Sequence, residues 1–253
     1  MYLNLQENEL SQNIYRIISY DRFIELFSTE KNTLVKPRLW EDTFENLTLK
    51  SKLIYPDSTE VEVETHERLY GQCWTTSQAS DAMWRIYSPD KRGIRIRTTI
   101  DSLLFSLTFA LSETPMTETC IGRVRYKSEK KILESAKNAF GDKGILTYDA
   151  LFNSLLTKRR AFIHENEVRL LYLDKNYDIP NQDLFKYEID PHKLISQVMI
   201  DPRISYEEFK KIKSGIINKT GYKGEIKRSL LYRLPESLTV NLKQNIGISS
   251  SKH

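Results

Sequence analysis

Hydrophobic and polar positions along the chain follow two different periods. Apolar side chains recur every three to four residues in several stretches, which predicts helices there: 20–29, 79–88, 99–111, 128–140, 148–163 and 205–221. Other stretches alternate apolar with polar residues or are rich in β-favouring types, which predicts strands: 15–19, 34–46 as far as its turn at Pro37, 68–77, 93–99, 121–127 and 165–173. The two kinds interleave without a regular strand–helix rhythm. We therefore expect an α+β fold of mixed, mostly antiparallel small sheets flanked by helices.

No repeat, linker or low-complexity stretch divides the chain. The pattern predicts a single domain over residues 1–240 and a flexible C-terminal tail over residues 241–253. Inside the predicted helix 79–88, we expect Met83 and Trp84 to be largely buried.

That same segment places Asp81 near the start of its helix. The two cysteines, Cys73 and Cys120, do not form a metal-binding spacing. We expect both to be buried, unpaired thiols.

Composition and charge narrow the function classes only slightly. The 253 residues include 38 Lys and Arg against 34 Asp and Glu, which gives a net charge of +4 and a pI of about 8.8. Such a mild excess permits contact with an anionic ligand such as a nucleotide or RNA, but does not require it. No apolar run approaches the ~18 residues of a membrane span, and the first residues lack a signal-peptide pattern. We expect a cytoplasmic protein without membrane contact.

Common catalytic motifs are missing from the sequence. It contains neither GxGxxG nor GxxxxGK[ST], and no GxSxG nucleophile elbow. In "HENEV" (164–168), Val168 replaces the second histidine of a zinc-binding helix. A metal-dependent nuclease would need clustered carboxylates, and Asp42, Glu45 and Asp81 are the candidates for such a cluster.

Two glutamates one residue apart precede an apolar run in "FIHENEVRLLYLD" (162–174). If 165–173 is a strand, Glu165 and Glu167 share a face with Arg169. Two adjacent carboxylates repel each other unless a cationic or polyhydroxylated partner lies between them. The pair is therefore a candidate site for a developing positive charge. The alternative is a solvated strand end with Arg169 as counter-charge.

Two further segments carry polar side chains on predicted strands. In "CWTTS", Thr75, Thr76 and Ser77 end a strand, where their hydroxyls can brace a ligand or a glutamate side chain. The alternative is a run of β-favouring residues that leads into a helix cap. In "YRIIS" (15–19), Arg16 can hold a phosphate in a bidentate grip, and the alternative is an exposed strand arginine.

Longer segments resemble a bacterial family, the domain of unknown function 2971. The resemblance extends from about residue 15 to 233 and is carried by four segments. They are "KPRLWEDTFEN" (36–46), "YGQCWTTSQASDAMWRIYSPDKRGIRIRTT" (70–99), "KRRAFIHENEVRLLY" (158–172) and "KRSLLY" (227–232).

A more distant resemblance is to ADP-ribosyltransferases of the arginine–serine–glutamate class. Those enzymes carry an arginine on an early strand, a Ser-Thr-Ser element on a middle strand and Glu-x-Glu at the start of a later one. Here "YRIIS", "WTTS" and "HENEVRLLYL" stand in that order. The resemblance implies an ADP-ribosyltransferase-like fold that uses NAD as a substrate and needs no metal.

The same resemblance implies cofactor-binding residues. Arg16 would hold the NAD phosphates. Thr75 and Ser77, with Thr76 between them, would brace the nicotinamide ribose and the catalytic loop. Thr75 departs from the family pattern, which has a serine at this position.

The resemblance also implies a different role for each of the two glutamates. Glu167 would stabilise the oxocarbenium-like ribosyl centre and be the more deeply set. Glu165 would lie further out and activate the acceptor.

The interpretation we favour is an NAD-dependent ADP-ribosyltransferase, a bacterial toxin or anti-phage defence effector that modifies protein or nucleic acid. This setting implies an antitoxin or a defence-system partner. Arginines in 91–97, 123–127 and 157–160 could receive a nucleic-acid acceptor, or could be solvated surface. The alternatives are a metal-dependent nuclease effector and a non-catalytic sensor or partner-binding module of a defence system.

Overall fold

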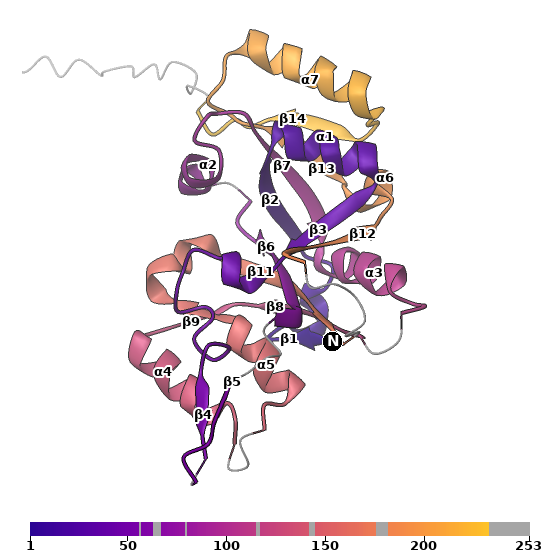
Figure 1. The fold of residues 1–253 in the computed structure, drawn as a ribbon. Coiled ribbons are helices and arrows are strands. Elements are labelled where there is room, and N and C mark those ends of the chain that lie inside the picture. Colours follow the sequence, from indigo (N-terminus) through magenta and orange to yellow (C-terminus); the bar gives the residue numbers. More distant parts are fainter. Residues whose placement is uncertain are drawn as a thin grey trace, which may run out of the picture.

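One long sheet runs through the molecule (Figure 1). The computed structural model describes residues 1–55, 57–62, 67–78, 80–114, 117–141, 145–175 and 182–232. Within these ranges the sheet follows the path β1-β8-β11-β6-β2-β7-β13-β14, with β3 beside β6 and β12 beside β3. Its strands are β1 (Tyr2–Leu3), β2 (Asn13–Ser19), β3 (Lys31–Val35), β6 (Leu69–Thr75), β7 (Gly93–Thr99), β8 (Thr117–Arg123), β11 (Glu167–Asp174), β12 (Leu184–Glu188), β13 (Gln197–Ile200) and β14 (Glu225–Arg228).

Two small sheets complete the strands that the structure describes. They pair β9 (Arg125–Lys127) with β10 (Thr157–Arg159), and β4 (Lys52–Ile54) with β5 (Glu60–Glu62). Pairing is parallel for β1 with β8, β9 with β10, and β13 with β14, and antiparallel for the other pairs. The predicted α+β class, with a mixed and mostly antiparallel arrangement, is confirmed.

Helices lie around the long sheet, with α1 beside α7 at one end of the molecule and α4 and α5 at the other (Figure 1). The α-helices are α1 (Tyr20–Thr29), α2 (Asp81–Tyr87), α3 (Ile100–Ala110), α4 (Glu129–Asn138), α5 (Tyr148–Leu155), α6 (Pro191–Leu194) and α7 (Tyr206–Thr220). Three 3-10 helices, η1 (Glu7–Glu9), η2 (Pro37–Leu39) and η4 (Arg160–Glu165), are described as well.

Hydroxyl side chains determine where most of these helices begin. An N-cap hydroxyl accepts a backbone N–H of the first turn in α1, α2, α3, α5 and α7. These caps are Ser19, Ser80, Thr99, Thr147 and Ser205. The helices predicted at 20–29, 79–88, 99–111, 128–140 and 205–221 are therefore found within a few residues of their expected bounds.

Strand β11 is buried along its whole length because it lies between β6 and β8. Side chains alternate between the faces of a strand. Val168 and Leu170 accordingly join the larger apolar cluster, and Leu171 and Leu173 join the smaller one on the other face. Glu167, the first residue of β11, thus starts a strand that is covered on both faces.

Strands β2 and β3 meet the same edge of β6 at separate points. Thr75 of β6 pairs with Tyr15 of β2, and Gly71 pairs with Val35 of β3. The remainder of this edge borders neither partner strand. A pocket opens there, and its residues are described below.

The segment before β11 differs from the predicted helix 148–163. Helix α5 ends at Leu155 because its last carbonyls bond to other parts of the chain: the Leu155 oxygen accepts from Arg169 Nη1 at 2.6 Å, and the Leu156 oxygen accepts from the Arg125 N–H at 2.8 Å. The chain then forms β10 and η4. The predicted strand 165–173 was wrong in its start, since Glu165 ends η4 and β11 begins at Glu167.

The packing predicted for α2 is confirmed. Met83 is buried with 8% of its surface exposed and Trp84 with 1%, and Asp81 is the first helical residue. On β7, the alternation expected for a half-buried strand holds in part. Ile94 and Ile96 are in the core, but Arg95 is also buried, because it packs over the Tyr15 ring.

Of the two cysteines, Cys120 is buried as expected and Cys73 is half-buried, and neither is in a disulfide. The domain bounds of 1–240 stay a prediction, and the predicted tail 241–253 lies outside the described residues. In the ranges that the structure covers, no helix is long and apolar enough to cross a membrane.

Candidate active site

Three glutamates surround the ammonium group of Lys158, which lies on β10. Lys158 Nζ is 2.5 Å from Glu165 Oε2, 2.7 Å from Glu167 Oε1 and 3.0 Å from Glu45 Oε1. All four residues are buried. The alternative of a solvated strand end was therefore wrong, because the carboxylates lie inside the protein with a cation between them.

Arg169 adds a second cation to this cluster. Its Nε donates to Glu167 Oε2 at 2.6 Å, and its Nη2 lies 3.0 Å from Glu45 Oε1. The guanidinium is fully buried and lies 4.4 Å from the centre of the Trp40 ring. The prediction that Arg169 shares a face with Glu167 is confirmed, and Arg169 is a counter-charge of Glu167, although inside the protein and not at a solvated strand end. Three carboxylates and two cations leave the cluster with a formal charge of −1 when all are ionised.

The two glutamates of the pair have opposite pKa shifts. Burial, and next the hydrogen bond and charge of Glu167, raise the pKa of Glu165 to about 7. Burial also acts to raise the pKa of Glu167, but Arg169, the hydrogen bond with Glu165 and Lys158 outweigh it, so this pKa is lowered. Near neutral pH the pair therefore contains one firmly ionised carboxylate and one that can take up a proton.

A left-handed residue brings the two carboxylates together. Asn166 has φ 45° and ψ 54°, a conformation that asparagine tolerates better than most residues. It turns the chain between η4 and β11. Glu165 and Glu167 thus meet at Lys158, although they do not alternate along one strand as the sequence suggested.

Hydroxyls at the end of β6 hold this turn in place. Thr75 Oγ1 donates to the Glu165 carbonyl at 2.5 Å and accepts the Ser77 N–H at 3.0 Å. The Thr76 N–H donates to the Asn166 carbonyl at 3.0 Å, and Asn166 Nδ2 donates to Ser77 Oγ at 2.9 Å. The segment therefore braces the backbone beside the glutamates, whereas the sequence predicted contact with a ligand or with a glutamate side chain.

A pocket of about 140 Å³ brings several predicted residues together at the open edge of β6. Arg16, Thr75 and Glu167 all line it, with Tyr87 of α2 and Cys73 of β6 among its other walls. Thr76, Ser77 and Glu165 do not line it. The arginine, the first threonine and the second glutamate of the predicted site thus converge on one pocket, while their roles in binding and catalysis stay predictions.

Arg16 is the unpaired cation of this pocket. Within the described residues its side chain makes no hydrogen bond or ion pair, and burial lowers its pKa. It also lines a second pocket of about 150 Å³, beside Arg22, Lys31 and Asn32. A half-buried guanidinium without a counter-charge is suited to bind an anionic ligand group.

Glu165 was expected to lie further out than Glu167; the two are equally shielded from solvent, and protein atoms surround Glu167 more closely than Glu165. Both residues are 4% exposed. Glu165 is covered because Lys158 binds its Oε2 and the Tyr87 hydroxyl donates to its Oε1 at 3.3 Å.

Sequence reasoning missed Lys158, Glu45 and the turn at Asn166. Lys158 was placed at a helix end, so its contact with the glutamates could not be inferred. Glu45 was considered only as a metal ligand. Asparagine between two glutamates was the one available signal of a turn, since asparagine is common in left-handed positions.

The acids proposed for a metal-dependent nuclease do not gather in one place. Asp42 pairs with Arg159 at 2.9 Å, Asp81 pairs with Arg85 at 2.7 Å on α2, and Glu45 belongs to the Lys158 cluster. Among the described residues, no group of three or more His, Cys, Asp or Glu side chains could hold a metal ion.

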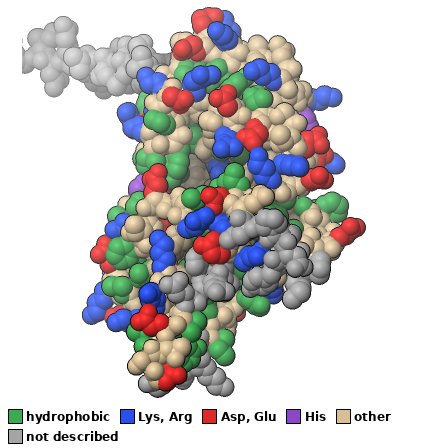
Figure 2. All heavy atoms as spheres, in the orientation of Figure 1, with side chains coloured by type: hydrophobic (Ala, Val, Ile, Leu, Met, Phe, Trp, Pro, Cys, Tyr) green, Lys and Arg blue, Asp and Glu red, His purple; other side chains and the backbone are tan. Residues whose placement is uncertain are grey.

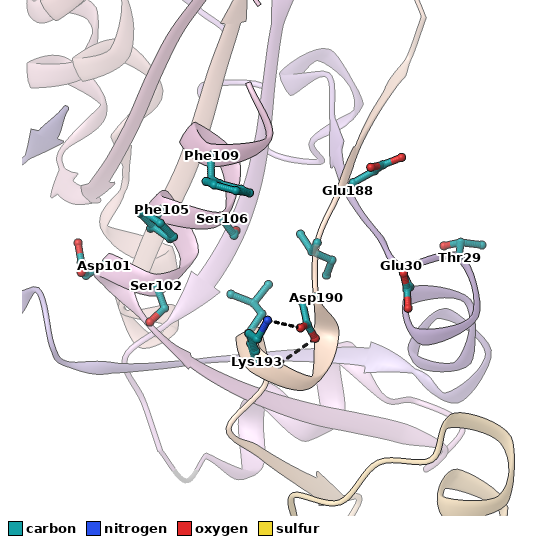
Figure 3. A pocket seen from close by; sticks show the side chains of 12 residues that line it. Thr29, Glu30, Asp101, Ser102, Phe105, Ser106, Phe109, Glu188, Asp190 and Lys193 are labelled. Atoms are coloured by element: carbon teal, nitrogen blue, oxygen red, sulfur yellow. Dashed lines mark hydrogen bonds and ion pairs between the residues drawn. The ribbon is translucent and has the colours of Figure 1, made fainter. Parts of the chain in front are cut away.

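A larger cavity, about 680 Å³, lies between α3, α6 and the ends of α1 and β12 (Figure 3). Phe105 and Phe109 stand along one side of it. The charged residues that line it are mainly acidic: Glu30, Asp101, Glu188 and Asp190, with Lys193 paired to Asp190 at 2.9 Å. This cavity is unsuited to an anionic ligand and contains none of the predicted site residues.

Basic residues do not form one continuous patch on the face shown in Figure 2, where blue and red side chains are interspersed. Arginines of the predicted basic segments have partners inside the protein: Arg97 donates to Ser196, Arg123 to Glu9 and Arg159 to Asp42. The expectation that these segments receive a nucleic acid stays untested.

Comparisons with known proteins add a family and a set of similar structures. Residues 83–170 match the family DUF2971. Its description is "Protein of unknown function". The resemblance inferred from the sequence is confirmed for this segment. None of the curated proteins matches the chain.

Three structures of Thermus sp. 2.9 DarT are similar in fold over most of their length. They are complexes with ADP-ribosylated ssDNA, with carba-NAD+ and with NAD+, at 10%, 11% and 11% sequence identity. The matches cover 89%, 88% and 86% of this chain and 96% of each DarT chain, with TM-scores of 0.36, 0.35 and 0.36. The likeness is distant.

Proposed function

We propose that this chain is an ADP-ribosyltransferase that uses NAD as its substrate. The observation that carries the proposal is the pocket at the edge of β6, where an unpaired arginine and an ionised carboxylate face the same space. NAD has a diphosphate that a guanidinium can bind, and a glycosidic bond whose cleavage needs a fixed negative charge. Arg16 and Glu167 meet these two needs.

In the proposed reaction, the bond between the ribose and nicotinamide breaks and its electron pair leaves with nicotinamide. The ribosyl carbon becomes positively charged, and the Glu167 carboxylate stabilises that charge. An O–H or N–H group of the acceptor then forms the new bond to this carbon, and its proton passes to Glu165. Thr75 keeps Glu165 in place through its carbonyl.

The biological setting that we propose is a bacterial toxin or anti-phage defence effector. The acceptor is a protein or a nucleic acid. One DarT complex contains ADP-ribosylated ssDNA, and single-stranded DNA is therefore one acceptor to assay. An antitoxin or a defence-system partner would limit the damage to the host cell.

The deciding experiment incubates the purified protein with NAD labelled in its adenine half, in the presence of single-stranded DNA, RNA or cell lysate. Label transferred to macromolecules, with release of nicotinamide, supports the proposal. NAD loss without transfer indicates a glycohydrolase. Intact NAD under all conditions contradicts the proposal and favours a non-catalytic sensor or partner-binding module, and nicking of the nucleic acid without NAD loss favours a nuclease.

A further inference from the structure

Glu45, Glu165 and Glu167 surround the ammonium group of Lys158 and form what we call the Lys158 cage. Three acidic oxygens lie within 3.0 Å of one ammonium group, and Glu165 and Glu167 approach it from different elements, η4 and β11. Without a cation between them, the two carboxylates would repel each other. Lys158 is itself held in position, since β10 pairs with β9 and the ammonium lies 4.6 Å from the centre of the Phe162 ring.

We propose that Lys158 is a positioning residue that holds Glu165 and Glu167 together and sets the pH at which Glu165 can accept the acceptor's proton. This rests on the proposed transferase function for its consequence in catalysis. The role is one of charge, because the ammonium contacts both members of the pair, while Lys158 itself does not line the pocket of Arg16 and meets it through Glu167.

The polar groups that face the pair come from six parts of the chain. They are Lys158 of β10, Glu45 of the loop after η2, Arg169 of β11, Tyr87 of α2, Tyr126 of β9 and Cys73 of β6. Burial raises the pKa of Tyr87, Tyr126 and Cys73, which keeps these groups neutral. Burial alone would lower the pKa of Lys158, but Glu167, Glu45 and Glu165 raise it, so the ammonium stays charged. Lys158 and Arg169 are thus the fixed positive charges among these groups, and of the two cations it is Lys158 that contacts the Glu165 carboxylate.

Two substitutions in the cage should move the titration of Glu165 in opposite directions. Lys158→Gln removes the positive charge, so Glu165 should bind its proton more tightly and titrate roughly one to three pH units higher. Glu45→Gln removes a competing carboxylate, so Lys158 should favour ionised Glu165 more strongly and the titration should move down. Lys158→Arg keeps the charge and should leave the titration close to that of the native protein.

The measurement is a carboxyl ¹³C NMR titration of the full chain, with Glu165→Gln used to assign the signal. Lys127→Gln is the matched control, since Lys127 lies on the neighbouring β9 and its ammonium contacts Ser135 instead of the glutamates. An unchanged Glu165 titration in Lys158→Gln, or equal shifts in Lys158→Gln and Lys158→Arg, would overturn the proposal. If Lys158→Gln does not fold, Glu45→Gln decides the matter. A downward shift of the Glu165 titration in that variant supports the proposal, and an unchanged titration contradicts it.

An activity measurement links this titration to catalysis. When transfer from NAD is measured at a fixed pH below the midpoint of the Glu165 titration, a rise of one unit in the pKa of Glu165 leaves about tenfold less of its ionised form. Lys158→Gln should therefore displace the pH profile of kcat upward while KM for NAD stays the same. The two proposals can be contradicted separately. Native protein that never consumes NAD contradicts the transferase function. A Glu165 titration that is the same in Lys158→Gln and in the native protein contradicts the positioning role.

Discussion

Arg16 and Glu167 carry opposite charges in one pocket, and they differ in whether other side chains neutralise them. Glu167 is held by two cations, so its ionised form is favoured by the folded protein. Arg16 has no such partner within the described residues, and burial opposes its charge. A half-buried guanidinium without a partner adds little to stability and is free to bind an anionic ligand group.

Replacing Glu167 by Gln removes the charge that would stabilise the ribosyl centre but keeps a similar shape. We expect NAD hydrolysis and transfer both to fall, by roughly a hundred- to thousandfold, the loss typical of a group that acts on the transition state. Glu165→Gln should lower transfer more than hydrolysis, because hydrolysis needs no acceptor to be activated. The measurement is nicotinamide release alongside label transfer, with circular dichroism to verify folding. Native activity in Glu167→Gln would show that the pair is structural.

Replacing Arg16 by Gln tests the binding of the diphosphate. Hydrogen bonds to a charged group contribute about 1.5–3 kcal/mol, so the Kd for NAD should rise roughly ten- to a hundredfold. The melting temperature should not fall, since no partner in the protein loses a bond. Arg85→Gln is the matched control: Arg85 lies on α2, is exposed and pairs with Asp81. Calorimetry that gives the same Kd for both variants would remove Arg16 from the site.

Periodicity was a sufficient guide to the elements with one clear apolar face. Helices α1, α3 and α7 and strands β2, β6 and β7 lie where the pattern predicted them. It failed between 156 and 166, where the chain forms β10, η4 and a left-handed turn in quick succession. Their geometry depends on distant partners such as Arg169 and Tyr126, which bond to Leu155 and Glu167. Local sequence does not contain that information.

The turn between η4 and β11 should depend on the backbone of Asn166. In Asn166→Ala, the left-handed conformation becomes costly, and we expect a loss of about 1–2 kcal/mol in the free energy of unfolding. In Asn166→Gly, the conformation is accessible again, and the variant loses mainly the bond from Asn166 Nδ2 to Ser77. Transfer activity should follow the same order, with glycine closer to the native protein than alanine. Chemical denaturation with equal losses for both variants would contradict this role.

The site draws on the whole chain, because its residues come from positions 16, 45, 75, 158, 165, 167 and 169. Three of the four recognised segments that resemble DUF2971 contribute to the cluster or the pocket, through Glu45, Thr75 and the run from 158 to 172. Sequence could identify these segments as a group but could not show that a lysine would stand between the carboxylates. Strands β10 and β11, helix η4 and the segment that carries Glu45 meet at this one cluster, so its ionisation should affect the stability of the fold.

The stability of the folded protein should therefore depend on pH through Glu165. Its folded pKa, about 7, is above that of an unfolded glutamate, so the folded state binds the proton more tightly. This contribution is fully present below about pH 4.5 and is lost as the pH rises through about 7. A difference of some 2.5 pH units corresponds to about 3 kcal/mol.

Glutamine at position 165 cannot titrate, so the test is the difference in free energy of unfolding between native protein and Glu165→Gln at a series of pH values. We expect that difference to fall by about 3 kcal/mol from pH 4.5 to above 7. Glu167 has a lowered pKa in the folded protein, so its stabilising contribution is fully present above the pKa of an unfolded glutamate. That contribution is lost as the pH falls through the folded pKa of Glu167, which is a lower pH range than the one for Glu165. A difference that stays constant across the range would mean that Glu165 is ionised throughout and that Lys158 neutralises it completely.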